Sequence, residues 1–263
     1  NESGQTLAFT VSNDNNGLVS VQPSIAPDGT LTFTVAANAF GSATVSVFLS
    51  DDGGTANGGD DTSPTVMFTI TVDPVNDGPS FTPGADVNVN EDSGAYSAPW
   101  ATAISAGPAN EAGQLLTFNV SNNNNALFSS QPSISPAGVL SFTPAPNAFG
   151  SATVTVSLSD NGGTANGGVD TSATVTFTII VAPVNDAPNA AADSWDTIGN
   201  TRLEVRSASI EPAPRVFTTG SVLANDSDID GPGPLTATLV GGSVTAGASV
   251  SMASDGTFLY TPP

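Results

Sequence analysis

The chain contains a long internal repeat. Residues 1–79 align with residues 110–188 without a gap, which gives a period of about 109 residues. The match includes identical motifs, since the segment Pro74–Asp77 recurs as Pro183–Asp186. A unit of this length is a whole domain, because the repeats that stack into solenoids are only about 20–45 residues long. The chain is therefore expected to be an array of similar domains.

Within each copy, apolar and polar residues alternate with a period of two. Val66, Phe68, Ile70 and Val72 would share one face of a strand, while the threonines between them would share the other. The chain has 27 glycines and 20 prolines, many of them in clusters between such strands, and no convincing amphipathic helix. About seven short strands per period predict an all-β fold of tandem, immunoglobulin-type antiparallel β-sandwiches joined into an extended rod.

The repeat also predicts the domain boundaries. Residues 1–77 form a sandwich that lacks its opening strand, and residues 78–187 form a complete one that opens with a strand at 85–89. Residues 188–263 form a divergent sandwich that includes a strand at 235–240 and lacks its closing strands. The sequence is expected to be a window on a longer chain, and the open edges of an incomplete sandwich would invite pairing with another chain.

The charge of the chain is strongly one-sided. There are 24 acidic and 3 basic residues, with a formal net charge of -21. The basic residues are Arg202, Arg206 and Arg215, so residues 1–201 contain no cationic side chain. Acidic groups in that region are dispersed in water, hydrogen-bonded or bound to a metal cation. A nucleic-acid partner is disfavoured because phosphate binding needs a basic surface. No apolar run is long enough to be inserted in a membrane.

The composition also argues against catalysis. The chain has no His, Cys or Lys, so its serines and threonines have no obvious activating base. A paired-carboxylate hydrolase is the one mechanism that survives, but nothing singles out a pair, and the candidate acids recur in both copies. The chain is expected not to be an enzyme.

Three motifs resemble a known family. Both copies end in Val-Asn-Asp-(Gly/Ala)-Pro, and both carry Leu-Ser-Asp earlier, at Leu49–Asp51 and Leu158–Asp160. The third unit contains Val-Leu-Ala-Asn-Asp-Ser-Asp-Ile-Asp-Gly at Val222–Gly231. The motifs of the two copies resemble the cadherin-like modules found in tandem arrays of bacterial surface and secreted proteins of the adhesin type, and the motif of the third unit resembles a sister type of module. The resemblance implies an extracellular or cell-surface location and calcium between consecutive domains.

The resemblance also implies a set of calcium ligands. Asp73, Asn76 and Asp77 resemble the calcium-binding linker of the family, although their spacing differs by one residue. The second copy has Ala182 in place of Asp73 and keeps the other two residues. Glu91 resembles an early glutamate ligand, and a late Asp-x-Gly turn matches one Asp per copy. A mid-domain acidic motif of the family has no counterpart, so one ion or none per junction is expected. The implied ligands are Asp51, Asp73, Asn76, Asp77, Glu91, Asp160, Asn185 and Asp186.

The third unit offers a further candidate calcium loop. Asp226, Asp228 and Asp230 occupy alternate positions before Gly231, like the first half of an EF-hand loop. The twelfth position is Ala237 instead of a bidentate Glu, so a true EF-hand is rejected. Two interpretations stay open here and at the linkers: a bound calcium ion, or Asp and Asn residues that serve as turn formers.

We therefore expect a structural extender or adhesion array of an extracellular surface protein, with junctions stiffened by calcium. The alternatives are a subunit of an extracellular filament or sheath, and a module that binds a glycan or a protein. The expected partners are neighbouring domains of the same chain, other copies of the chain, or a cell-surface receptor or glycan.

Overall fold

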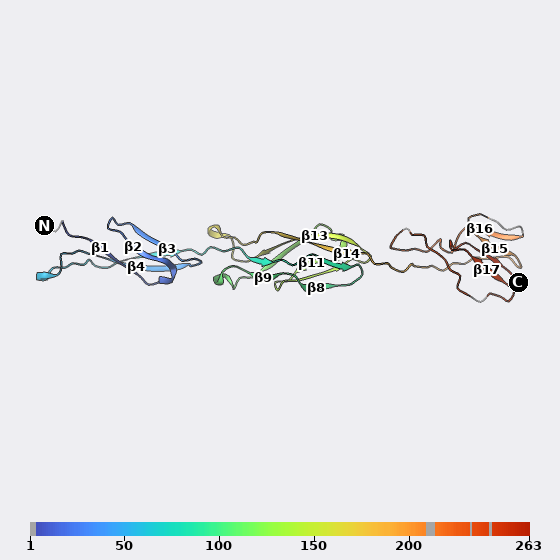
Figure 1. The fold of residues 1–263 in the computed structure, drawn as a ribbon, viewed down its shortest axis with the longest axis horizontal. Helices are drawn as coiled ribbons and strands as arrows, with labels where there is room; N and C mark the ends of the chain where they lie inside the picture. The colour runs from blue at the N-terminus through green and yellow to red at the C-terminus, as the bar shows by residue number, and fades with distance from the viewer. Residues whose placement is uncertain (1–3, 209–213, 232, 242–243) are drawn as a thin grey trace.

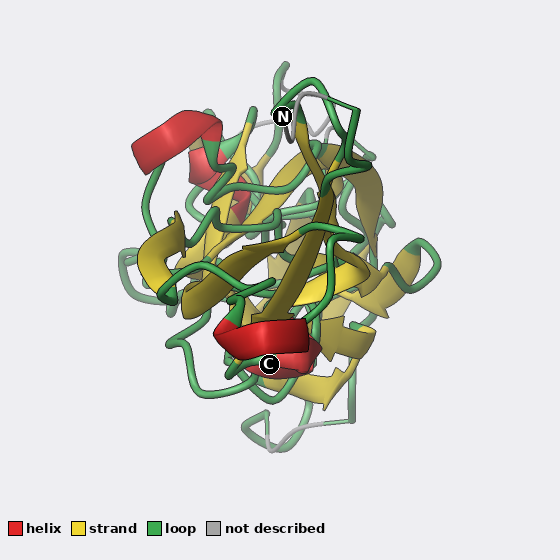
Figure 2. Cartoon of the chain, turned by 90° about the vertical axis from the view of Figure 1, so that its left-hand side faces the viewer, coloured by secondary structure: helices red, strands yellow, loops and turns green. Residues whose placement is uncertain are grey.

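The computed structural model describes residues 4–208, 214–231, 233–241 and 244–263. The chain is elongated, with three groups of strands arranged end to end along one axis (Figure 1). Seen along that axis, the strands of successive groups overlap in a compact outline (Figure 2). We call these groups the first unit (β1–β5), the second unit (β6–β14) and the third unit (β15–β18). The prediction of an all-β rod is confirmed; the domain boundaries stay predictions.

The first unit has two small antiparallel sheets. One has the order β1-β4-β5, and the other consists of β2 and β3. The strands are β1 (Ala8–Asn13), β2 (Val19–Ile25), β3 (Leu31–Val35), β4 (Gly41–Ser50) and β5 (Val66–Val72).

The second unit repeats this arrangement and extends both sheets. They now have the orders β10-β13-β14-β7 and β11-β12-β8, and a third, short sheet pairs β6 with β9. The bounds are β6 (Ser80–Thr82), β7 (Val87–Asn90), β8 (Tyr96–Pro99), β9 (Thr102–Ser105), β10 (Thr117–Asn122), β11 (Phe128–Ile134), β12 (Val139–Pro144), β13 (Gly150–Ser159) and β14 (Val175–Ala182).

The opening segment of the second unit contains more strands than the sequence predicted. A strand was expected at 85–89, and β7 forms at Val87–Asn90, where it pairs in parallel with β14. No strand was predicted within residues 100–106, but β9 pairs there with β6. So short a strand shows little alternation of its own, and its formation depends on its pairing partner.

The two added edge strands close the core of the second unit. Phe142 on β12 is 2% exposed beside β8, whereas its counterpart Phe33 on β3 is 37% exposed. The second unit has one continuous core that includes Leu140, Val154 and Ile179 from both sheets. Among the described residues, the first unit lacks counterparts of β7 and β8, so β3 and β5 each have an unpaired edge.

The third unit has one sheet of the order β16-β15-β18-β17. Glu204 on β15 is fully buried, and its carboxylate lies 3.1 Å from Arg206 Nε and 3.4 Å from Arg215 Nε. Two of the three basic side chains that the sequence concentrates in this unit, Arg206 and Arg215, therefore form a local ion-pair cluster with Glu204. The strands are β15 (Arg202–Val205), β16 (Arg215–Thr218), β17 (Ser249–Met252) and β18 (Phe258–Thr261).

The predicted strand at 235–240 is wrong, because the structure has no strand there. The segment makes one backbone hydrogen bond with Ser254, from the N–H of Ala237. Val240 is 83% exposed. Alternation alone cannot hold a strand without a neighbour along its length. None of the helices in the described part of the chain is long and apolar enough to cross a membrane.

The closed and open cores predict unequal responses to the same substitution. Phe142→Ala should lower the free energy of unfolding of the second unit by about 3–5 kcal/mol, because it leaves a cavity in a closed core. Phe33→Ala in the first unit should cost about 1–2 kcal/mol, because that ring is already partly in water. Hydrogen exchange resolved by residue would measure each unit separately. Equal costs at the two positions would contradict the difference in packing.

Candidate functional site at the two linkers

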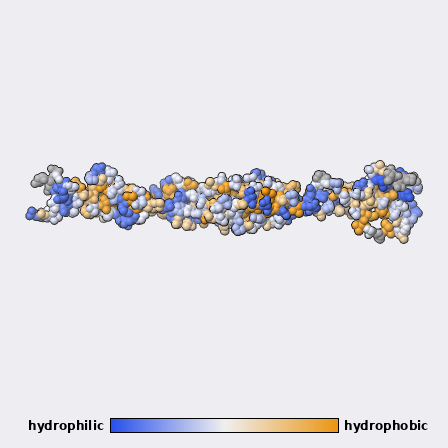
Figure 3. Space-filling view, in the orientation of Figure 1, coloured by the Kyte–Doolittle hydropathy of each residue, from blue (hydrophilic) through white to orange (hydrophobic). Residues whose placement is uncertain are grey.

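The two linkers are the segments 73–79 and 183–188, which join successive units, and the space-filling view shows the rod narrowing between its larger parts (Figure 3). In the first linker, Asn76 is buried against loops of the second unit. Its amide nitrogen donates to Asp160 Oδ1 at 3.0 Å and also to the carbonyl oxygen of Val169. Its amide oxygen accepts a hydrogen bond from Gln114 Nε2 at 2.7 Å. All of its side-chain polar groups are thus satisfied by the following unit.

The backbone of the same linker is bound to the same loops. The N–H of Val169 donates to the carbonyl oxygen of Asn76 at 2.9 Å, and Asn166 Nδ2 donates to the carbonyl oxygen of Pro74 at 3.2 Å. The N–H of Asp77 donates to Glu111 Oε1 at 3.1 Å. We call this set of contacts the asparagine clasp. It fixes the linker to the unit that follows it.

Two glycines let Asn76 approach so closely. A Cβ atom on Gly162 would lie 1.7 Å from Asn76 Oδ1, and one on Gly168 would lie 3.0 Å from the Asn76 backbone nitrogen. The first of these distances is far below contact, so any larger residue at position 162 would displace the asparagine. The glycines of the Gly-Gly pairs that flank this loop therefore have a packing role.

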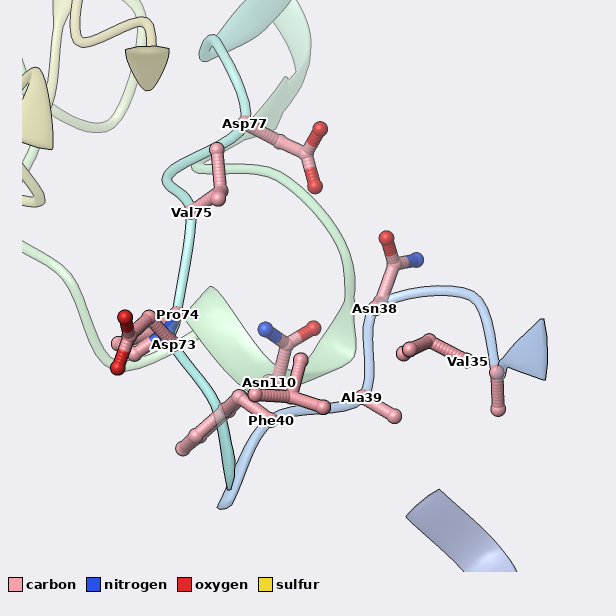
Figure 4. Close-up of a pocket in the computed structure, with 11 residues that line it drawn as sticks. Val35, Asn38, Ala39, Phe40, Asp73, Pro74, Val75, Asp77 and Asn110 are labelled. Carbon is pink, nitrogen blue, oxygen red and sulfur yellow. The ribbon is translucent and has the colours of Figure 1, made fainter. Parts of the chain in front are cut away.

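The upstream side of the first linker is more open. A cavity of about 250 Å³ lies between the loop that follows β3 and the linker, and Asn110 of the second unit lines part of it. In Figure 4, Phe40 of that loop points toward Asp73 and Pro74, Asn38 lies on the opposite side of the cavity, and Asp77 lies at the far end of the linker. Asp73 and Asp77 are both exposed in this region. The linker is thus bound closely on one side and loosely on the other.

In the second linker, a buried glutamate supplies the upstream contact. Glu91 follows β7 and is 2% exposed. Its Oε1 accepts a hydrogen bond from the N–H of Val184 at 2.8 Å. Its Oε2 is buried and makes no hydrogen bond. A buried carboxylate oxygen without a donor carries a large desolvation cost, so this atom needs a proton, water or a cation.

Asp186 brings the two sides of the second junction together. Its N–H donates to a carboxylate oxygen of Asp230 in the third unit, and its own Oδ2 is buried and makes no hydrogen bond. Burial raises the pKa of Asp186 above its ordinary value, and negative charges around it raise it further. These charges belong to Asp230, Asp92, Glu91 and Asp228, in order of decreasing effect. Of the sequence-predicted ligands, Asp230 therefore contacts Asp186 directly, and Glu91 and Asp228 lie close enough for their charges to act on it.

The remaining predicted ligands have other surroundings. Asp51 Oδ1 accepts the N–H of Gly53 in the first unit, far from either linker, and Asp226 Oδ1 accepts the N–H of Ala191. Asn185 is exposed and donates to the carbonyl oxygen of Asp186. Within residues 4–208, 214–231, 233–241 and 244–263, no three acidic side chains already stand in the geometry of a metal site.

Three residues that contribute to the junctions were not predicted from the sequence. Glu111 accepts the N–H of Asp77 as Asp230 accepts that of Asp186, so the two acids have the same role. Gln114 completes the clasp, and Asp92 adds charge to the second junction. A signal existed for two of them, because Asn-Glu-x-Gly-Gln occurs in both copies, at 1–5 and 110–114. Asp92 lies next to Glu91 and had no separate motif.

Comparisons with known proteins give distant likenesses. No family model matches the chain, and no curated protein matches it either. Similar solved structures include human protocadherin-24 EC1-2 in its form II, with 16% identity and a TM-score of 0.41 over 69% of this chain and 84% of that one. Chicken VE-cadherin EC1-2 has 19% identity and a TM-score of 0.29 over 66% of this chain and 83% of that one.

An S-layer protein is also among the similar structures. Domains 4 and 5 of the S-layer protein SbsC have 19% identity and a TM-score of 0.26, over 66% of this chain and 70% of that one. At these identities and TM-scores the likenesses carry no argument about function. The functional proposals below therefore rest on contacts within the chain.

The clasp predicts that the two linker asparagines differ in importance. Asn76→Ala should lower the free energy of local opening at the Val169 amide by about 1–3 kcal/mol, because it removes three hydrogen bonds and leaves buried partners unpaired. Asn185→Ala, the matched control, should change the second linker little, because its side chain is exposed. Amide hydrogen exchange measures both effects. Similar responses of the two variants would show that the clasp does not hold the first linker.

The raised pKa of Asp186 predicts a pH effect in the absence of calcium. An acid whose pKa is raised by folding favours the folded arrangement most when it is protonated. The second junction should therefore tighten as the pH falls from neutrality toward the ordinary aspartate value, about 3.9. Exchange of the Asp186 amide in a chelating buffer would report this change. Asp186→Asn should abolish the contribution, whereas an unchanged pH profile in that variant would assign the effect to other groups.

Proposed function

We propose that the chain is an extender segment of an extracellular structural or adhesive protein, and that calcium stiffens its second junction. The observation that supports the calcium proposal most directly is the buried, unpartnered Oε2 atom of Glu91. It lies in a group of carboxylates that come from both sides of the linker. The extracellular location is part of the same proposal, because calcium is abundant enough there to fill weak sites.

The charges around the second junction favour a cation over a proton. Glu91, Asp92, Asp186, Asp228 and Asp230 are all acidic, and no basic residue precedes Arg202 in the sequence. Arg206 and Arg215 pair with Glu204 instead. At neutral pH, a carboxylate group of this kind is relieved by a divalent ion that prefers oxygen ligands. Calcium would draw Asp186, Asp228 and Asp230 around the free oxygen of Glu91.

A bound ion would couple two units because its ligands come from three parts of the chain. Glu91 belongs to the second unit, Asp186 to the linker, and Asp228 and Asp230 to the third unit. Neither sandwich core is involved, so removal of the ion should free the angle between units without unfolding either one. This is the behaviour expected of a spacer whose length depends on calcium.

Calcium titration of the whole chain tests this function. Isothermal titration calorimetry should detect binding, and small-angle X-ray scattering should show a longer maximum dimension with calcium than with chelator. Glu91→Gln should weaken binding by about tenfold or more, since it removes a charged ligand from a buried site. Asp193→Asn, which removes an exposed acid of the third unit, is the control and should bind calcium normally.

Two results would contradict the proposal. Identical scattering curves in calcium and in chelator would remove the stiffening role. Equal calcium affinity in Glu91→Gln and Asp193→Asn would show that the ion, if bound, lies elsewhere on the acidic surface.

A further inference from the structure

The first unit contains the same loop as the one that holds Asn76 in the second unit. Asp51 Oδ1 accepts the N–H of Gly53 at 2.8 Å, and Asp160 Oδ1 accepts that of Gly162 at 2.9 Å. At the base of the loop, the N–H of Asp51 donates to the Asp61 carbonyl at 3.1 Å. The N–H of Asp160 donates to the Asp170 carbonyl at 3.0 Å. The two loops therefore share their hydrogen bonds as well as their sequence.

The backbone at the tip of the loop is also the same. Asn57 has φ 56° and ψ 26°, and Asn166 has φ 58° and ψ 21°, so both are left-handed. This conformation costs a non-glycine residue energy, and Asn tolerates it better than most residues do. The loop of the first unit adopts it although no linker residue contacts it within the described part of the chain. The loop's own sequence thus preforms the shape.

The glutamine of the clasp has a counterpart in the same position. A Cβ atom on Gly53 would lie 2.2 Å from Gln5 Nε2, and one on Gly162 would lie 2.6 Å from Gln114 Nε2. Each unit thus places a glutamine amide over the first glycine of its loop. In the second unit, that amide donates to Asn76 Oδ1.

A cavity opens beside these groups in the first unit. It has a volume of about 250 Å³, and its lining includes Leu7, Asp51, Asp60 and Thr62. Asp60 corresponds to Val169, which binds Asn76 through its backbone N–H and carbonyl groups alone. The change of side chain at this position therefore leaves the binding groups intact.

We propose that this loop of the first unit, together with Gln5, is a binding site for an extended Pro-Val-Asn-Asp segment of another unit of the same repeat. Asp51 and the carbonyl of Asp60 accept hydrogen bonds from the asparagine amide nitrogen, and Gln5 donates to the amide oxygen. The N–H of Asp60 binds the asparagine carbonyl oxygen. The site would join units head to tail in the manner of the first linker.

The chemistry of the site selects asparagine. An aspartate in its place would set a second carboxylate against Asp51, in a region without cations. An alanine would leave the acceptors of Asp51 and Asp60 and the donor of Gln5 unpaired. This inference extends the proposed array function, but it needs no metal, so it can hold if the calcium proposal fails and fail if calcium binds.

A synthetic peptide tests the site on the whole chain. The peptide covers residues 71–80, and its control carries alanine at the position of Asn76. NMR titration of the chain with excess chelator should shift the amides of Gly53, Gly59 and Asp60. The alanine peptide should bind about tenfold or more weakly, because three hydrogen bonds are lost. Gly53→Ala in the chain should abolish binding by filling the space under Gln5.

A second experiment attaches the linker segment covalently to the first unit, so that its result does not depend on the affinity of a free peptide. Residues 73–109 placed directly before Asn1 reproduce the order found in the second unit, because the copies align without a gap. Exchange of the Asp60 amide in this chimera should be slowed about tenfold or more relative to the same chimera with the grafted asparagine changed to alanine. Both chimeras contain the grafted strands, so the difference isolates the asparagine.

Three outcomes would overturn the proposal. One is equal protection of Asp60 in the two chimeras. Another is equal binding of the two peptides. The third is a calcium-dependent shift of Asp51, Asp60 and Asp61 that no peptide alters, which would make the loop an ion site instead.

Discussion

The absence of any cationic side chain before Arg202 decides how this chain can use its acidic residues. Ion pairs with cationic side chains are impossible within the first two units, and several carboxylates accept hydrogen bonds from N–H donors instead. Asp160 accepts a hydrogen bond from the side-chain amide of Asn76. Glu111 accepts one from the backbone N–H of Asp77, and Asp86 accepts one from the backbone N–H of Thr178. Each of these bonds joins segments that are distant in the sequence. These acidic residues therefore hold distant segments of the fold together, in addition to giving the surface its negative charge.

The same constraint makes the two junctions chemically different. At the first, an uncharged amide hydrogen-bonds to Asp160 Oδ1, although Asp160 Oδ2 and Gln114 Oε1 stay buried without a hydrogen bond. At the second, Glu91 and Asp186 each retain a buried oxygen that no donor reaches. An amide clasp works at any calcium concentration, whereas a group of carboxylates needs an ion or protons to come together. If the proposed ion binds, the rod combines an attachment made by hydrogen bonds with one that depends on calcium.

The sequence predicted the parts of this structure that depend on periodicity. The strand around Phe68 follows from alternation. Glu91 and Asp186 were expected from the family resemblance and Asp228 and Asp230 from a separate loop motif, but the sequence did not indicate that these residues lie at one junction. The short strand β9 was not predicted, and the predicted strand at 235–240 does not form, because pairing partners, and not local pattern, decide such segments. The asparagine clasp could not be predicted, since a ligand-like Asn gives no sign of whether its nitrogen or its oxygen will face a carboxylate.

The parallel pairing of β7 with β14 has a consequence for a chain that transmits force. The second unit is entered through its first strands and left through β14, and Val87 to Asn90 lie alongside Ile179 to Ala182 in the same direction. Tension applied at the two linkers would pull these neighbouring strands toward opposite poles. The hydrogen bonds between them would then be loaded in shear and would have to break together, instead of opening one after another as in an unzipping hairpin. A unit closed in this way is built to resist stretching along the axis of the rod.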